Sequence, residues 1–486
     1  MIKYLNSLNL KEETKTLVIG VTQKNQREEL KDILTKLNEH KNIYEACEVT
    51  VYYPLSDFQT KRFVFVGLGE DDYDLDDVRE VFSLVAEEIT DDTIIDFDSF
   101  RVLHDDVRLL SEIASETLGL VNYKFPDYKT DKKAEKEPEV YFYSEIDITE
   151  GITAGNINAI ATNHARTLVN EPRNKLTPSL LAEYAVNLAK ELNIDYKIYN
   201  KKEIEELKMG AFLAVNQGSK EEAKLIHLKY RNNDSDEIIT LIGKGLTYDS
   251  GGYSIKPKTG MVNMKTDMGG AAAVLGAIEI IARKKLPVNV DVVIAATENL
   301  INSEAIVPDD VVVSMSGKTI EITNTDAEGR LTLVDAVTYA RKHNATKIID
   351  VATLTGCVIT ALGTDITGIF TNNKDFLNEV VEASKLTGEA VWELPVDPFR
   401  AGCRKSKVAD YNNSPGRDGH ASFGAAFIAE FAEDTPWIHL DIAGTCYKEV
   451  PHKLGPVGAT GVMVRTLAKY LEMKKGAVKK INSLSK

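Results

Sequence analysis

The chain has 486 residues, of which 43% are hydrophobic and 27% are charged. This length suggests two or three domains, and the composition is that of a folded protein, which excludes a single small module and a disordered chain. Lys and Arg number 58 against 74 Asp and Glu, and the resulting formal charge of −16 repels nucleic acid and anionic lipid on average.

Four scattered cysteines without a C-x-x-C pair do not indicate a disulfide framework or a structural zinc site. The first ten residues contain no apolar stretch of signal-peptide length. The richest internal apolar run, residues 269–282, is interrupted by Glu279 and is too short to span a bilayer. We therefore expect a cytoplasmic protein without a membrane anchor.

The first third of the chain alternates short β-branched runs with polar helical stretches. Residues 16–20 and 63–67 are predicted to be buried strands, and residues 28–37 a helix. The acidic stretch 70–77 precedes an apolar-periodic helix that runs to Ile89. Such a cluster can hold calcium, but acids before a helix mostly complement its N-terminal dipole, and we favour that interpretation.

A charged connector separates this region from the rest. Ten of the sixteen residues 124–139 are charged and two are proline, which predicts a solvated segment. We place the domain boundary just beyond it. The prediction is a two-domain α/β protein: a smaller N-terminal α/β domain over residues 1–150, and a larger catalytic domain over 151–486 with a central, mostly parallel or mixed sheet.

The larger domain contains four strong strand signals, each followed by residues rich in Gly, Asp, Thr or Asn. These strands are expected at residues 238–242, 288–296, 347–351 and 437–442. Because ligands of open α/β sheets bind at the carboxyl ends of strands, we expect the functional site in the loops that follow them.

A glycine-rich loop is predicted after the first of these strands. Residues 243–252 contain Lys244 and Asp249, Lys256 follows, and residues 265–270 contain Asp267. Neither G-x-x-x-x-G-K-[ST] nor G-x-G-x-x-G is present, and the two aspartates would face the phosphates of a nucleotide. A nucleotide cradle is therefore disfavoured.

A second acidic segment follows the 288–296 strand and a turn at Pro308. If this segment is extended, Asp326, Glu328 and Arg330 project to one side, and an amphipathic helix begins directly after them. Two carboxylates and a guanidinium would then share one pocket.

Four carboxylates thus stand near predicted strand ends: Asp249, Asp267, Asp326 and Glu328. Any one of them alone would more often be a helix cap or an exposed turn residue. Together they would repel one another unless cations neutralised them, which favours a two-metal site. No H-E-x-x-H, H-x-H or G-x-S-x-G pattern is present, and His439 is expected to be a core residue of its apolar strand.

These segments resemble the leucyl aminopeptidase family of dinuclear metallopeptidases. The resemblance is carried by residues 243–252, by 265–270 and above all by NTDAEGRL at 324–331. Supporting matches lie at residues 168–172, 352–356, 439–445 and 458–461. The resemblance covers the C-terminal two thirds of the chain, whereas the first third shares only the α/β pattern.

The resemblance implies ligands for two divalent ions, Zn²⁺ or Mn²⁺. Asp249, Asp326 and Glu328 would hold one ion. The second would share Asp249 and Glu328 and add Lys244 and Asp267. An adjacent dication disfavours an ammonium group, so Lys244 is expected to be a neutral amine donor.

The resemblance also implies the catalytic and substrate-binding residues. Lys256 would remain charged and point at the scissile carbonyl, and Arg330 would hold a bicarbonate ion that carries the proton. The residues implied around the first side chain of the substrate are Met264, Thr353, Leu354 and Gly356. They suggest an apolar pocket that favours leucine-like residues.

The implied activity is release of N-terminal leucine and other apolar residues from peptides by a homohexamer of two stacked trimers. Two positions depart from the family pattern: Asp309-Asp310 stands where Gly-Asp is common, and His420 where a small residue is usual. The rival hypothesis is a DNA-binding role. The net charge disfavours it, although residues 129–136 form a mixed-charge cluster. An inactive scaffold is disfavoured because every implied ligand is present.

Overall fold

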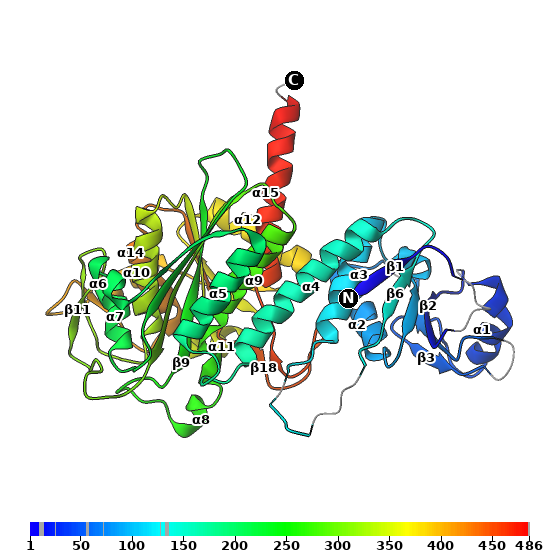
Figure 1. Cartoon of the computed structure of the whole chain (residues 1–486), viewed down its shortest axis with the longest axis horizontal. Coiled ribbons are helices and arrows are strands. Elements are labelled where there is room, and N and C mark those ends of the chain that lie inside the picture. The colour runs from blue at the N-terminus through cyan, green and yellow to red at the C-terminus, as the bar shows by residue number, and fades with distance from the viewer. Residues whose placement is uncertain are drawn as a thin grey trace. The chain divides into compact units, whose positions relative to one another are not determined.

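The computed structural model describes residues 1–8, 14–24, 26–54, 58–70, 72–126, 128–131 and 136–484, with side chains up to Lys474 (Figure 1). The chain forms two compact units. Unit 1 comprises Met1–Asn163 with Val450–Val457, and unit 2 comprises His164–Glu449 with Gly458–Lys486. The division falls inside helix α4 (Thr149–Asn170), and the boundary predicted near residue 150 lies at the start of this helix.

Unit 1 is built on a six-stranded sheet with the order β1-β6-β5-β2-β4-β3, in which only β3 runs antiparallel to its neighbour. Every residue of the central strand β2 is buried, because a parallel sheet is covered on both faces. The strands are β1 (Ile2–Leu5), β2 (Thr16–Val21), β3 (Val49–Tyr52), β4 (Arg62–Gly67), β5 (Thr93–Asp96) and β6 (Val140–Tyr143). The helical elements are η1 (Glu28–Leu30), α1 (Lys31–Asn38), α2 (Leu75–Glu87), η2 (Phe97–Leu103), α3 (Val107–Val121) and the first part of α4.

The acidic stretch before α2 caps the helix. The Asp74 side chain accepts hydrogen bonds from the backbone N–H groups of Asp76 and Asp77, and the Asp77 side chain accepts one from the Asp74 N–H. This reciprocal pair satisfies orphan donors of the first turn, as the dipole interpretation predicts. Part of the predicted connector, residues 127 and 132–135, lies outside the described residues, as does residue 71 of the acidic stretch.

Unit 2 contains an eight-stranded mixed sheet with the order β15-β14-β17-β13-β9-β10-β8-β7. Its core strands β17, β13, β9 and β10 are parallel, as predicted for a mostly parallel or mixed sheet. The sheet strands are β7 (Asp195–Tyr199), β8 (Lys224–Arg231), β9 (Ile239–Asp249), β10 (Asn289–Asn299), β13 (Lys347–Ala352), β14 (Thr367–Thr371), β15 (Val391–Glu393) and β17 (Trp437–Asp441). Smaller sheets pair β11 (Val311–Val313), β12 (Thr319–Glu321) and β16 (Tyr411–Asn412), and β18 (Tyr447–Lys448) with β19 (Gly458–Ala459).

Helices surround this sheet (Figure 1). They are α5 (Pro178–Leu192), α6 (Lys201–Glu206), α7 (Gly210–Asn216), α8 (Lys258–Met261), η3 (Met264–Met268), α9 (Gly269–Arg283), α10 (Gly329–Lys342), α11 (Gly356–Leu362), α12 (Lys374–Thr387), α13 (Asp397–Cys403), α14 (His420–Ala432) and α15 (Val464–Leu484). Within the described part of the chain, none of the helices combines the length and apolar composition needed to cross a bilayer.

The glycine-rich segment is strand, not the loop that the sequence suggested. Strand β9 continues through Gly243 to Asp249 and pairs in parallel with β10 and β13. A Cβ on Gly243 would lie 2.5 Å from the Cα of Ala271 in α9. Glycine is therefore needed for close packing of a helix on the strand rather than for a turn.

The second acidic segment is a turn, so the condition under which residues 326–330 would be extended is not met. The Ala327 N–H donates to the Asn324 carbonyl at 3.2 Å, and Arg330 lies in the first turn of α10. This helix is buried on all sides from Gly329 to Ala340, so the predicted amphipathic pattern does not hold there. The turn still delivers Asp326 and Glu328 to one site.

Candidate metal centre

Three carboxylates from two distant segments converge at the carboxyl end of β9. Asp249 ends the strand, and Asp326 and Glu328 come from the turn before α10. Each offers an oxygen, and these oxygens all lie within 4.8 Å of one another. Asp249 and Glu328 are buried, and Asp326 is half-buried.

Lys244 links Asp267, the fourth predicted carboxylate, to these three carboxylates. Its Nζ lies 2.9 Å from Asp267 Oδ1 and 2.9 Å from Glu328 Oε1, and it donates to the Thr353 carbonyl at 2.9 Å. A Cβ on Gly329 would lie 2.6 Å from this Nζ, so only glycine leaves room for the lysine. Burial disfavours the ammonium form, but the carboxylates of Asp267, Glu328 and Asp249 outweigh it and raise the pKa of Lys244.

Lys256 forms the second cationic bridge. Its Nζ lies 2.8 Å from Asp249 Oδ2 and 2.5 Å from Asp326 Oδ1. Burial again opposes the charge, and the carboxylates around it raise the pKa of Lys256. The five predicted metal ligands and Lys256, the residue expected to face the scissile carbonyl, therefore belong to one cluster.

The cluster has too little positive charge. Four carboxylates face two lysines, and burial raises the pKa of Asp267, Asp326 and Glu328. The Asp267 Oδ2 atom is buried and lacks a hydrogen-bond partner among the described residues. Buried carboxylates of this kind are stabilised by cations, and carboxylate oxygens with one amine nitrogen suit divalent ions. The residues present therefore fit a divalent metal centre.

A neighbouring asparagine positions Asp249. Asn299, at the end of β10, donates from Nδ2 to Asp249 Oδ1 at 2.8 Å and to the Thr325 carbonyl at 3.0 Å. The Gly251 N–H also donates to Asp249 Oδ1 at 2.8 Å, with Gly251 at a φ of +84° that favours glycine. Asn299 was not singled out from the sequence; its place at the carboxyl end of a strand was the available signal.

Arg330 is a buried cation with a free donor. Its side chain is 1% exposed, and it donates to the Asn413 carbonyl at 2.8 Å, while its Nε has no hydrogen-bond partner within the described ranges. Burial lowers the pKa of Arg330, and the negative charges of Glu328 and Asp441 offset this only in part. These features fit a bound anion such as bicarbonate.

The predicted substrate-binding residues lie on the segment after β13 and on η3. Thr353 Oγ1 donates to Asp267 Oδ1 at 2.8 Å, and the Leu354 N–H donates to Asp441 Oδ1 at 3.0 Å. Met264 is half-buried in η3, and Gly356 is exposed at the first residue of α11. Asp441, which also accepts from Thr355 Oγ1 at 2.7 Å, holds this segment and was missed from the sequence.

The two positions that depart from the family pattern both lie in unit 2. Asp309 has a φ of +79°, the left-handed conformation in which glycine is the common residue. His420 is the first residue of α14. Burial, together with the Arg330 charge, lowers the pKa of His420 to about 4.

Comparison with known proteins identifies relatives over nearly the whole chain. The profile of the cytosol aminopeptidase family, catalytic domain, matches residues 163–468, and that of the same family's N-terminal domain matches residues 12–132. Two solved structures, the bottromycin maturation enzyme BotP and BotP in complex with Mn, are each 29% identical to this chain. Each superposes with a TM-score of 0.85 over 95% of this chain and 99% of that chain.

Proposed function

The chain belongs to the cytosol aminopeptidase family and is a metallo-aminopeptidase, and from this premise we propose that it releases leucine and other apolar residues from peptide N-termini with two divalent ions. The observation that carries the two-ion proposal is the charge deficit of the cluster, four carboxylates against two lysines. With both lysines protonated, one divalent ion would balance the four carboxylates. An ion bound to the Lys244 nitrogen would displace its proton, and the negative charge that then remains calls for a second ion.

The proposed ligand sets are those that the family resemblance implies. Asp249, Asp326 and Glu328 would hold one ion, and Lys244, Asp249, Asp267 and Glu328 the other. When bound, the ions would supply Lewis-acid activation of water and of the scissile carbonyl. Zn²⁺ and Mn²⁺ are the metals that we propose, and BotP has been solved with Mn.

The chain's own residues would act around these ions. Lys256 keeps its proton and would place a positive charge where the carbonyl oxygen becomes negative. Arg330, with its free Nε donor, would orient a bicarbonate ion that accepts and returns a proton. The segment with Thr353 and Leu354, fixed by Asp267 and Asp441, would align the substrate backbone.

The proposed preference for leucine rests on the residues beside the cluster. Met264 and Leu354 offer apolar, half-buried side chains, and Gly356 is exposed without a side chain to fill the space. An apolar pocket distinguishes leucine from smaller residues by roughly 1–3 kcal/mol for each missing methylene. We further propose a cytoplasmic homohexamer that acts on peptides, without a membrane or nucleic acid partner.

Release of leucine from a Leu-peptide by purified protein tests this proposal. Activity should be lost on exhaustive chelation and restored by Mn²⁺ or Zn²⁺, and metal analysis should give two ions per chain. A Leu-, Ala- and Glu-peptide series tests the preference, and an N-acetylated Leu-peptide should not be cleaved. Activity that survives chelation, or equal turnover of the acetylated peptide, would contradict the proposal. Light scattering of the same preparation tests the hexamer.

A further inference from the structure

Unit 1 contains a crevice of about 240 Å³ at the carboxyl ends of its parallel strands. It is lined by the end of β2, by Gln26 and Arg27, by the last residue of β5 and the segment that follows it, and by Glu145 after β6. The crevice belongs entirely to unit 1, so the argument for a ligand there does not depend on the proposed peptidase chemistry of unit 2.

The crevice lies where the strand order of the sheet reverses. From β2 the chain moves to β4 on one side, and from β4 it crosses to β5 on the other side of β2. The connections that leave β2 and β5 therefore diverge and open a space between them. In open α/β sheets this is the position at which ligands bind.

A buried carboxylate that lines the crevice, that of Asp96, has one oxygen without a hydrogen-bond partner among the described residues. Asp96, the last residue of β5, is 2% exposed, and its Oδ2 accepts a hydrogen bond from Arg27 Nε at 2.6 Å. Its Oδ1 is buried without a hydrogen-bond partner among the described residues. Such an oxygen costs free energy unless a donor reaches it, so it points to a ligand with an N–H or ammonium group.

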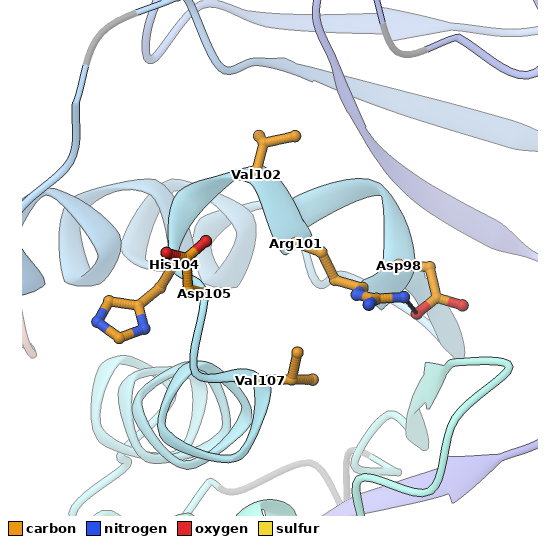
Figure 2. A pocket seen from close by; sticks show the side chains of 6 residues that line it. All are labelled: Asp98, Arg101, Val102, His104, Asp105 and Val107. Atoms are coloured by element: carbon orange, nitrogen blue, oxygen red, sulfur yellow. Dashed lines mark ion pairs between the residues drawn. The ribbon is translucent and has the colours of Figure 1, made fainter.

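A second carboxylate of the crevice, that of Asp98, already accepts hydrogen bonds on both oxygens. Asp98 Oδ1 accepts from Ser144 Oγ at 2.7 Å, and its Oδ2 accepts from the Glu145 N–H at 2.7 Å. Its pairing with Arg101 is loose, at 3.8 Å, and Arg101 is 46% exposed (Figure 2). The Arg101 guanidinium is therefore available to a second anion.

Arg27 is held as the second cation of the crevice. Its Nε is committed to Asp96, and its guanidinium carbon lies 5.6 Å from the centre of the Tyr143 ring. Arg27 lines the crevice, and these two contacts hold its guanidinium in place there. Cation and anion stand side by side on these walls, which is the pattern complementary to a zwitterion.

Charge and size exclude other ligand classes. Three carboxylates, from Asp96, Asp98 and Glu145, line the crevice with the two arginines, so a phosphate ester would meet net repulsion. The volume is also below the roughly 300–1,000 Å³ of pockets for drug-sized ligands. A small molecule with one amine and one carboxylate fits both limits.

We propose that this crevice binds a free α-amino acid, whose ammonium group donates to Asp96 Oδ1 and whose carboxylate faces the guanidiniums of Arg27 and Arg101. Asp98 and Arg101 also line a second, more open hollow of about 290 Å³ with His104, Asp105 and Val107 (Figure 2). The amino acid side chain points toward this hollow, so recognition rests on the backbone groups of the ligand.

Equilibrium dialysis of labelled leucine against the full chain tests the proposal. The measurement uses the Glu328→Gln variant with a chelator present, which removes leucine binding at the metal centre. One equivalent of leucine should still bind to this variant, at the crevice of unit 1. Asp96→Asn in this background should weaken binding at least tenfold, and Arg101→Gln, an exposed change that leaves the core intact, several-fold. Asp105→Asn, in the open hollow only, is the matched control and should bind as the background does.

Competition distinguishes the two halves of the ligand. 3-Methylbutylamine lacks the carboxylate and N-acetyl-leucine lacks the ammonium, and each should compete at least tenfold more weakly than leucine or glycine. Equal competition by either analogue would overturn the assignment of an amino acid. Loss of all leucine binding in the Glu328→Gln background would show that the catalytic unit alone binds it and would also overturn the proposal.

Discussion

Units 1 and 2 place charged side chains at the same topological position, the carboxyl ends of parallel strands, but with different charge balance. In unit 2, four carboxylates surround two lysines, and the cluster is largely buried. In unit 1, two arginines stand beside three carboxylates in a partly open crevice. The sheet topology therefore sets where a ligand binds, and the local charge sets whether it is a cation or a zwitterion.

The largest expected effect is the loss of metal from unit 2 when one of its carboxylates is replaced. Glu328→Gln and Asp249→Asn each remove a charge that both proposed ions share, so we expect loss of metal and a fall in kcat of at least 10³-fold. Asp105→Asn, on the exposed surface of unit 1, is the matched carboxylate control and should retain the metal content and the peptidase activity of the parent protein. Metal analysis and leucine release measure both. Full metal occupancy in Glu328→Gln would contradict the assigned bridge.

Lys256→Ala distinguishes a residue that binds the metals from one that stabilises the oxyanion. The lysine is itself a cation beside Asp249 and Asp326, so its removal should leave the metals bound. The loss of the charge that meets the oxyanion should lower kcat by about 10²- to 10³-fold. Lys258→Ala, on the exposed surface of α8, controls for the loss of a nearby lysine. Loss of metal from Lys256→Ala would show that its role is structural.

Arg330→Ala tests whether unit 2 also carries an anion site. The buried guanidinium has an Nε without a hydrogen-bond partner among the described residues, and it is not one of the proposed metal ligands, so the variant should lose about 10²-fold in kcat while it keeps its metals. Added bicarbonate should restore part of the rate, because the arginine only orients that ion. Chloride at equal ionic strength is the control. The absence of any bicarbonate effect on either protein would exclude this anion.

Asn299→Leu tests a positioning residue that the metal ligands depend on. Leucine has a similar volume but cannot donate to Asp249 Oδ1 or to the Thr325 carbonyl. Loss of such a contact behind a ligand typically costs about 10- to 100-fold in metal affinity. We therefore expect a raised metal requirement, with activity regained at high Mn²⁺. Asn302→Leu, on the exposed surface, should leave the metal titration unchanged.

The parts of the fold predictable from the sequence were those with a strong local pattern. The β-branched runs at β2, β4 and β13 gave strands because such runs are buried on both faces. The glycines of β9 suggested a loop because glycine is rare in strands, whereas the tight approach of Ala271 explains Gly243. That contact is tertiary and leaves no local signal.

The site was predictable where acidic residues cluster in the sequence and not where one polar residue acts alone. Asp249, Asp326 and Glu328 meet as expected, although the segment of Asp326 is a turn. Asn299 and Asp441 were missed because a single polar residue at a strand end has many ordinary roles. His439 is buried as predicted, with Nδ1 2.5 Å from Asp350 Oδ1, but its Nε2 has no hydrogen-bond partner in the described chain.

The smallest expected effect concerns His420, whose charge would oppose that of Arg330. Its pKa is lowered to about 4 in the folded chain, by burial first and then by Arg330, against about 6.5 for an ordinary histidine. The unfolded chain therefore takes up a proton between pH 6.5 and pH 4 that the folded chain does not. The free energy of unfolding must then fall as the pH falls through this window, and be unaffected by this group above it.

His420→Gln removes this pH dependence and keeps a polar side chain of similar size. At pH 5 the full linkage is about 2 kcal/mol, and partial exposure of the ring reduces it to about 1 kcal/mol. Both tryptophans, Trp392 and Trp437, lie in unit 2, so urea denaturation followed by their fluorescence reports on the unit that contains His420. Between pH 7 and pH 5 the variant should lose about 1 kcal/mol less stability than the parent protein. His40→Gln, on the exposed surface of unit 1, controls for the loss of a histidine as such. Equal dependence of the free energy of unfolding on pH for the parent and His420→Gln would contradict the lowered pKa. The imidazole would then carry a proton at pH 5 in the folded chain, as a second positive charge beside Arg330.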